Sequence, residues 1–392
     1  MKKFINKLFV ASLLVGGIVT LGACSSDDDS PKSYPVTVGV TLGDGLTLND
    51  VSDLVVVAKN SRGAADTLNL TNGQTSVVLP KGTYTITVNG KVKDEATAYV
   101  TGSTTAEIYA ANANVNIPLS KMNRSTLIFK TIYNAGSIMG YVKDTFFEIV
   151  NNSDEVQYLD GVILFAPQGN QRQPNEWQAH GITDTYPAGQ GPVVYFPGTG
   201  KEHPLQPGES VIVANDAVNH AELSDTITSP DLTNADWEIY LDYADGEIDY
   251  PAPNLVVLWN NNRYMKAWGL GFLGRAFVLA RLPEGITPEE FAADKSNFQT
   301  APGTTSTTME YMMMPSKYVL DAVDVWNPNS KEHYSTFLPK DDAQGVLSAG
   351  MYTAKCERRK VSSTTATGRK YYQDTNNSSE DFLTDQPLVE EK

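Results

Sequence analysis

The sequence predicts a mainly all-β protein composed of two successive β-sandwiches, and three observations support this prediction. Short runs rich in β-branched and aromatic residues recur along the chain, separated by turn residues. The run TYTITV at residues 83–88 alternates strictly, which places Tyr84, Ile86 and Val88 on one face of a strand. Only two short stretches have a helical pattern. Several strands at regular spacing indicate antiparallel sandwiches.

The first folded region is expected at residues 34–120. Asn72-Gly73 predicts a hairpin turn between two of its strand-like runs, and Gly82 lets the backbone turn before the next run. The stretch LPKGTYTITVNG resembles the transthyretin-like or carboxypeptidase-regulatory modules of secreted proteins. This resemblance implies a small immunoglobulin- or transthyretin-like β-sandwich that serves as a spacer.

A hinge at residues 121–125 leads to a larger β domain at residues 125–392. The run FFEIVNNSDEVQYLDGVIL resembles the opening of a lamin-tail-type domain, which is an immunoglobulin-like β-sandwich. Four later runs resemble further strands of that fold: LQPGESVIVANDA, YVLDAVDVWN, KCERRKV and YYQDTNNSSEDF. The resemblance implies a lamin-tail-like sandwich with a mixed insertion at about residues 218–317.

Two helices and two strands are expected within that insertion. AVNHAELSD predicts one short helix, and TPEEFAADKS predicts another that begins after Thr287 as N-cap, with Glu289 and Glu290 in its first turn. PAPNLVVLW and GFLGRAFVLARL are apolar almost without interruption. Such runs predict strands that are buried on both faces.

Residues 1–23 have the organisation of a lipoprotein signal peptide. Three lysines precede a short apolar run, as in a secretory signal. The following Leu-Gly-Ala-Cys resembles the lipobox of bacterial lipoproteins, which implies that Cys24 is lipidated and becomes the first residue of the mature chain. An ordinary signal peptide with an incidental cysteine is the alternative.

The acidic, serine-rich residues 24–33 resemble the tether that sends lipoproteins of the Bacteroidota to the outer face of the outer membrane. A plain solvated linker is the alternative explanation. The order of signal, tether and β domains resembles a family of Bacteroidota surface lipoproteins, and this resemblance brings no activity with it. We therefore expect a lipid-anchored, surface-exposed outer-membrane protein.

The charge balance argues against one class of partner. The chain has 30 basic and 46 acidic side chains and a net charge of −16. Removal of residues 1–23 takes away three lysines and no acid, so the mature net charge would be −19. Such a surface repels phosphate backbones, so nucleic acid is not expected as a partner.

The sulfur-containing side chains are expected to be structural. With Cys24 acylated, Cys356 has no partner for an internal disulfide, and its alternating surroundings predict a buried cysteine on a strand. In YMMMPSKY, strand alternation places Met312 and Met314 on one face and Met313 on the other. Core filling explains the three methionines, and a soft-metal or haem site is the alternative.

No catalytic signature is present. The four histidines, His180, His203, His220 and His333, are not at metal-binding spacing. The sequence also lacks a nucleophile elbow and a dinucleotide fingerprint. We therefore expect neither an enzyme nor a cofactor.

Calcium is the one ion for which the sequence offers weak candidates. The turn-rich stretch LDYADGEIDY contains Asp242, Asp245, Glu247 and Asp249, and hard oxygen ligands at alternate positions suit Ca²⁺. The spacing is not that of an EF-hand loop. A solvated acidic turn around Asp-Gly explains the same residues.

Aromatic side chains provide ligand-binding candidates. All five tryptophans lie in the second domain, and rings on loops can stack on sugars or planar ligands. The candidates are Trp177, Trp268, Tyr264 and Trp237, with core packing as the alternative for each. Trp326, in the strand-like run AVDVW, is expected in the core.

These observations together favour a non-enzymatic binding or accessory protein at the cell surface. Its expected partners are the membrane, through the lipid anchor, an outer-membrane transporter barrel, and a glycan or small-molecule nutrient. One alternative is an adhesin-like structural protein. Another is a polysaccharide hydrolase whose paired carboxylates lie in residues 218–317.

Overall fold

The computed structural model confirms the predicted all-β class. Sheets dominate the described part of the chain, and its helices are short. Within that part, no helix has the length and apolar character needed to cross a membrane. The structure describes residues 32–388 except 61–64, 94–97, 124, 140, 142, 170, 172, 190, 223–227, 244–245, 262–267, 269–273 and 305–308.

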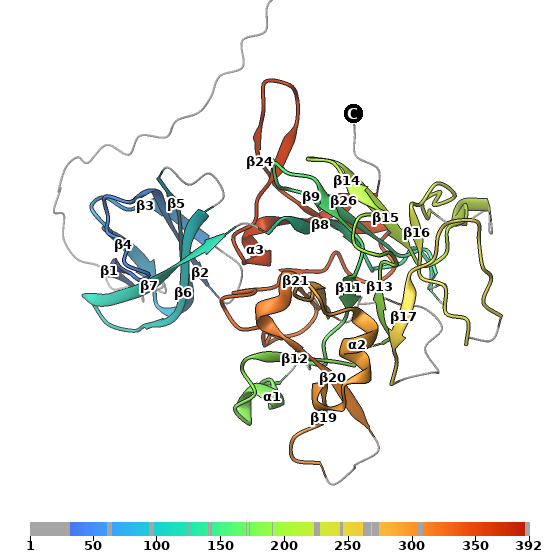
Figure 1. The fold of residues 1–392 in the computed structure, drawn as a ribbon. Coiled ribbons are helices and arrows are strands. Elements are labelled where there is room, and N and C mark those ends of the chain that lie inside the picture. Colours follow the sequence, from blue (N-terminus) through green and yellow to red (C-terminus); the bar gives the residue numbers. More distant parts are fainter. Residues whose placement is uncertain are drawn as a thin grey trace, which may run out of the picture.

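The first domain is a seven-stranded sheet that folds back on itself, with strand order β3-β2-β5-β6-β7-β1-β4. One half of β7 runs antiparallel to β6 and the other half parallel to β1, so this long strand joins two layers (Figure 1). The strands are β1 (Ser33–Leu42), β2 (Val51–Asn60), β3 (Ala65–Asn69), β4 (Gln74–Pro80), β5 (Gly82–Val92), β6 (Ala98–Ile108) and β7 (Ala113–Asn123).

The interior of this sandwich follows the predicted alternation. Tyr84, Ile86 and Val88 on β5 are buried in one apolar cluster. Asn72 and Gly73 both have positive φ, of 52° and 72°, and form the expected tight turn. The period-two pattern therefore decides which face of β5 is in the core.

The second domain contains two six-stranded sheets. The first has the order β16-β15-β9-β8-β23-β26, and the second has the order β17-β13-β11-β18-β21-β22. The strands of the first sheet are β8 (Leu127–Tyr133), β9 (Phe146–Asn151), β15 (Ser210–Ala214), β16 (Trp237–Glu238), β23 (Lys355–Arg359) and β26 (Phe382–Pro387). Those of the second are β11 (Val162–Phe165), β13 (Val193–Tyr195), β17 (Val256–Trp259), β18 (Arg275–Arg281), β21 (Val319–Trp326) and β22 (Val346–Leu347).

One apolar core joins the two six-stranded sheets. Phe129 and Phe147 from the first sheet share a cluster with Phe277 and Leu279 from the second. A second cluster lies between the β18 sheet and a three-stranded sheet of β12 (Thr185–Ala188), β20 (Glu310–Pro315) and β19 (Phe298–Thr300). The smaller elements are β10 (Gln157–Tyr158) with β14 (Pro204–Leu205), β24 (Val361–Thr364) with β25 (Lys370–Tyr372), α1 (Glu176–Ala179), α2 (Pro288–Ala293), α3 (Ser378–Asp381), η1 (His220–Glu222), η2 (Lys295–Asn297) and η3 (Ser316–Tyr318).

Residues 218–317 are built into this sandwich and do not form a separate unit. Strand β16 pairs with β15 of the first six-stranded sheet, and β18 lies between β11 and β21 in the second. The expected burial of β18 on both faces is confirmed, because Ala276 to Ala280 are all buried. The same expectation for β17 is wrong, since this strand lies at a sheet edge and Val256 is 39% exposed.

The two expected helices have different outcomes. Helix α2 begins after Thr287, whose side chain accepts the Glu290 N–H while the Glu290 carboxylate accepts the Thr287 N–H. The prediction of this helix and its N-cap is confirmed. The other stretch forms only the short 3₁₀ turn η1, and residues 223–227 lie outside the described part.

The sulfur-containing side chains pack as expected. Cys356 is fully buried on β23, and burial raises the pKa of its thiol to about 12. Met312 and Met314 lie in the cluster beneath the β18 sheet, whereas Met313 packs in a separate cluster with Trp177. The alternation along β20 is therefore confirmed, and all three methionines fill apolar interiors.

Candidate functional site

The strongest candidate site is a groove of about 530 Å³ between the two domains. We call it the interdomain groove. Strands β2 and β5 form one wall, and the end of β21 with the segment after it forms the other. A cavity of this volume is within the usual range for small-molecule sites.

The first-domain wall follows from strand register. Thr83 and Thr85 lie on the face of β5 opposite to its buried residues. Lys59 and Asn60, at the end of β2, pair with Thr85 and Tyr84 of β5. Two hydroxyls, an amide and an ammonium group therefore meet on one small area of this wall.

The second-domain wall has a fixed aromatic pair. Trp326 is 9% exposed, and its ring stacks on His333 at 4.9 Å with an interplanar angle of 6°. His333 Nε2 lies 2.7 Å from the Asn327 carbonyl oxygen, so this nitrogen carries the proton and donates. At Gly345 a Cβ atom would lie 2.6 Å from Trp326 Nε1, which explains the need for glycine there.

Contacts between the domains hold the two walls in place. Asn377 Nδ2 of the second domain donates to Thr87 Oγ1 of the first at 3.5 Å. At the hinge between the domains, the Ser125 N–H donates to Asp374 Oδ2 at 2.8 Å. Tyr99 of the first domain is only 5% exposed, and burial and Asp374 of the second domain raise the pKa of its hydroxyl. Figure 1 shows α3 at this junction, beside the first domain.

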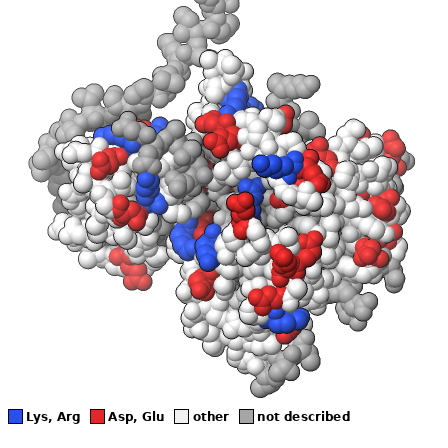
Figure 2. Space-filling model, viewed as in Figure 1, with Lys and Arg blue, Asp and Glu red and all other residues white. Residues whose placement is uncertain are grey.

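The groove has more basic than acidic side chains, unlike the chain as a whole. Lys59, Lys331 and His333 line it with one carboxylate, Glu332, which accepts a hydrogen bond from Tyr334 at 2.9 Å. Burial lowers the pKa of Lys59, and the Glu380 carboxylate acts in the opposite direction. Figure 2 shows basic side chains near the junction of the two domains on this face, together with acidic ones.

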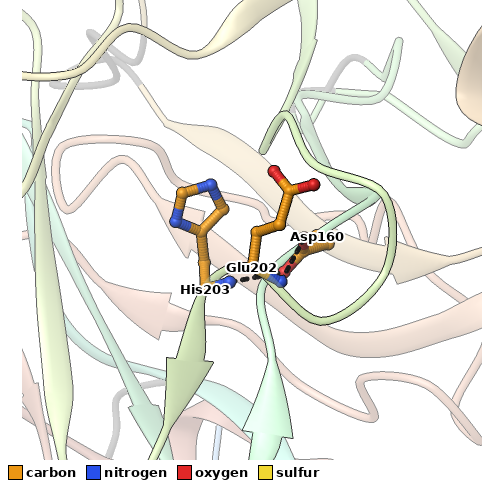
Figure 3. Close-up of side chains that lie close together, drawn as sticks. All are labelled: Asp160, Glu202 and His203. Carbon is orange, nitrogen blue, oxygen red and sulfur yellow. Dashed lines mark hydrogen bonds between the residues drawn. The ribbon is translucent and has the colours of Figure 1, made fainter.

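A second group of chemically active side chains is Asp160, Glu202 and His203, whose ligand atoms lie within 4.8 Å of one another (Figure 3). The Asp160 carboxylate already accepts the N–H groups of Gly200, Glu202 and His203 at 3.2, 2.9 and 2.9 Å. Burial raises its pKa, but these backbone hydrogen bonds outweigh burial and lower it. In Figure 3 the side chains of Glu202 and His203 extend to the same side, and the dashed lines join Asp160 to backbone N–H groups. The geometry fits a clamp on the loop before β14.

Substitution of Asp160 by asparagine tests this clamp. The amide has one acceptor oxygen where the carboxylate has two, so a partly buried N–H loses its partner and the free energy of unfolding should fall by about 2 kcal/mol. Urea denaturation measures this effect. Glu202→Gln is the matched control and should change stability little, with or without added divalent metal. A larger effect of Glu202→Gln in the presence of metal would contradict the clamp and favour a metal site.

The predicted ligand-binding aromatic residues lie in the interior. Trp268 is fully buried beside Phe147 and donates from Nε1 to the Pro192 carbonyl at 2.6 Å. Trp177 and Trp237 are 4% and 5% exposed. These positions correct the expectation that the rings stack on a ligand from loops, because their faces are covered by core side chains. The fourth candidate, Tyr264, lies outside the described residues.

The described calcium candidates make separate contacts. Glu247 forms an ion pair with Lys143, and Asp249 accepts a hydrogen bond from Asn254 at 2.8 Å. Asp242 is exposed, and Asp245 lies outside the described residues. The described members of this loop therefore do not converge on one point.

Lys143 also contacts a buried carboxylate, Asp216, at 3.4 Å. Burial raises the pKa of Asp216 to about 6 and that of Glu238 to about 7. The Glu238 side chain is fully buried at the end of the first six-stranded sheet. These acids form part of an interior polar cluster.

Sequence reasoning missed the residues of the interdomain groove. Lys59 and His333 are more than 270 positions apart in the chain, and neither belongs to a motif. Trp326 was expected in the core, and it is buried there, but it also lines the groove. The one available signal was the polar threonine face of the strand at residues 83–88.

Comparisons with known proteins find similarity to one family. Residues 206–388 match the family model described as "Protein of unknown function (DUF4876)". The chain is similar to the crystal structure of a DUF4876 family protein from Bacteroides thetaiotaomicron VPI-5482, with 28% sequence identity and a TM-score of 0.61 over 91% of this chain and 96% of that chain.

A more distant match is the crystal structure of a candidate adhesin from Bacteroides ovatus ATCC 8483. It has 11% sequence identity and a TM-score of 0.20, over 39% of this chain and 60% of that chain. A likeness at this level carries no argument about function. No curated protein matches the chain.

Proposed function

We propose a function from the geometry of the chain, because the DUF4876 family, whose model matches residues 206–388, has no known function. The protein is a lipid-anchored binding protein on the outer face of the outer membrane, and it holds a small ligand in the interdomain groove. The anchor rests on the sequence alone, since Cys24 and the rest of residues 1–31 lie outside the described part.

The observation that carries the proposal is that two domains together form one groove of small-molecule size. Interdomain contacts such as Asn377 to Thr87 fix its walls before any ligand arrives. A site that needs little ordering on binding loses less of its interaction energy to entropy. Polar groups on one wall and an aromatic pair on the other give such a site both hydrogen bonds and apolar contact.

The lining of the groove favours binding over hydrolysis. Glycoside hydrolysis uses two carboxylates on either side of the scissile bond. The groove is lined by one, Glu332, which is hydrogen bonded to Tyr334. Among the described acids of residues 218–317, Glu238 is fully buried and Glu247 is paired with Lys143. We therefore propose a protein without enzymatic activity and without a cofactor.

We also propose that the protein delivers its ligand to an outer-membrane transporter barrel and that its second domain is related to lamin-tail sandwiches. The first measurement is isolation of the lipidated protein from outer membranes in mild detergent, with the Cys24→Ala form as the unanchored control. A co-purifying barrel supports an uptake role. A protein that binds whole cells or matrix but no barrel supports the adhesin alternative.

Thr85→Trp should abolish ligand binding at the groove. Thr85 lies on an outward face of β5, where an indole fits a strand well and would fill the groove. The labelled full chain, applied to an array of diverse glycans, should give a set of ligands that this variant loses. Thr67→Trp, at an exposed position of β3, is the matched control and should keep them. Ligands that the Thr85→Trp variant still binds would contradict binding in the groove.

A further inference from the structure

We propose that the ligand of the interdomain groove is an anionic saccharide, one that carries carboxylate or sulfate groups. This inference rests on the proposed function and adds the chemical class of the ligand. It depends on two lysines, one on each wall, on one histidine nitrogen, and on the hydroxyl groups of the first-domain wall.

Lys59 offers the first positive charge. Its side chain lies at the end of β2, half-buried in the groove wall. In the part of the chain that the structure describes, no carboxylate lies within ion-pair distance of its ammonium group. Glu380 acts on the Lys59 ammonium through space, and Lys360 acts in the opposite direction, so neither charge is a direct partner. A half-buried ammonium without a direct ion-pair partner is stabilised when an anion binds beside it.

Lys331 offers the second charge from the opposite wall. It is exposed, and it too has no ion-pair partner among the described residues. One lysine therefore comes from each domain, and an anion in the groove meets positive charge on both sides. The chain has a net charge of −16, so this local reversal of sign is not a consequence of composition.

His333 adds a directional contact. Its Nε2 proton is donated to the Asn327 carbonyl and its ring is stacked on Trp326, so the ring position is fixed. Nδ1 has no hydrogen-bond partner among the described residues and can accept a hydrogen bond from a ligand hydroxyl. An aromatic surface with a nearby acceptor suits a sugar ring, which has apolar C–H faces and hydroxyls at its edge.

The remaining groups fit the uncharged part of a sugar. Thr83 and Thr85 present hydroxyls, and Gln344 lies on the other wall. These short side chains donate and accept hydrogen bonds in the way that ring hydroxyls require. A volume of about 530 Å³ holds one or two sugar rings and excludes a long folded partner. Charge, stacking and hydroxyl contacts therefore point to the same class of ligand.

The test compares matched sugars on the purified full chain by titration calorimetry. Digalacturonate is compared with its methyl ester, which removes the charge and keeps the sugar, and a sulfated disaccharide is compared with its unsulfated form. We expect each anionic member to bind at least about tenfold more tightly, and its affinity to fall as salt is raised. The two pairs separate carboxylate from sulfate recognition.

Lys59→Gln and Lys331→Gln should each lower the affinity for the anionic probe about tenfold, and should leave the affinity for any neutral sugar unchanged. Lys81→Gln and Lys295→Gln are the matched controls, because both lysines are exposed and lie outside the groove lining. Melting curves establish that all four variants are folded.

Failure of the ligand class and failure of the groove would give different results. If neutral sugars bind as tightly as acidic ones and Thr85→Trp abolishes both, the anionic class is wrong and the binding function stands. If acidic probes bind the original protein and also bind the Thr85→Trp variant and both lysine variants equally well, the binding site lies outside the interdomain groove and the proposed function is wrong. If no acidic probe binds, the inference is overturned.

Discussion

Replacement of Arg359 by alanine is expected to lower the free energy of unfolding by about 3 to 5 kcal/mol. Arg359 lies on β23 and is 3% exposed. Its Nη2 atom is 2.6 Å from Asp321 Oδ2, and Nη1 is 3.3 and 3.5 Å from Asp374 and Asp381. Nε donates to the Phe129 carbonyl at 2.8 Å. One buried guanidinium therefore forms ion pairs with three buried carboxylates.

The cost comes from the carboxylates that would remain. With Arg359 present, burial still raises the pKa of Asp321 to about 7 and raises that of Asp381. Without it, three acids would have to hold charge in the interior or take up protons. Asp374 also accepts the Ser125 N–H, so the loss should reach the connection between the domains.

Urea denaturation of the full chain measures this effect. Arg369→Ala is the matched control, because Arg369 pairs with Asp154, which is 60% exposed, and such a pair should contribute about 1 kcal/mol or less. If Arg359→Ala does not fold, Arg359→Lys provides the measurement, since it keeps the charge but loses the planar fork of donors. Equal effects of the Arg359 and Arg369 substitutions would show that the buried network contributes no more than a surface pair.

The features that sequence predicted well are those encoded by local periodicity. The alternation around Ile86 and across Met312 to Met314 correctly assigned buried faces, because a strand has a period of two wherever it lies. The cap at Thr287 was equally local, since it depends on residues three positions apart. The all-β class follows from many such signals.

The features that sequence predicted poorly depend on what lies across space. Strand β17 has the apolar composition of a central strand, but its position at a sheet edge is set by β13, its one partner strand. Trp177 stands in a polar stretch, and yet Tyr311 and Met313 cover it from a distant strand. Neither the edge position of β17 nor the burial of Trp177 can be predicted from local composition.

The threonine face of β5 shows the same limit. Alternation predicts a polar face for residues 83, 85 and 87, and this face is polar, but Thr87 is only 3% exposed because the second domain covers it. Thr83 and Thr85 line the interdomain groove for the same reason. A polar strand face can be exposed to solvent, covered by another domain, or part of a binding site. Only the way the domains pack decides among these.

Glu357→Gln is expected to make the protein more stable at pH 8 and less sensitive to pH. Glu357 is fully buried on β23, where one carboxylate oxygen accepts the Ala349 N–H at 2.7 Å. Burial raises its pKa from 4.5 to about 8. The folded protein therefore keeps the proton of Glu357 at pH values where the unfolded chain has already lost it.

The sign follows from proton linkage. Below about pH 4.5 both states are protonated at this position, and Glu357 has no effect on the pH dependence. Between pH 4.5 and about 8 only the unfolded state ionises, so stability falls as pH rises, by up to about 1.4 kcal/mol per pH unit. Above pH 8 the loss is constant. Glutamine cannot ionise, so the variant escapes this loss.

Urea denaturation of both forms between pH 5 and 8.5 measures the difference in slope, which isolates Glu357 from the other buried acids. Glu107→Gln, at an exposed position on β6, is the matched control and should leave the slope unchanged. Parallel curves for Glu357→Gln and the original protein would mean that this carboxyl ionises at the same pH in both states. Glu357 would then be ionised in the interior of the folded protein, and the hydrogen bond from the Ala349 N–H would have to compensate for the cost of burying its charge.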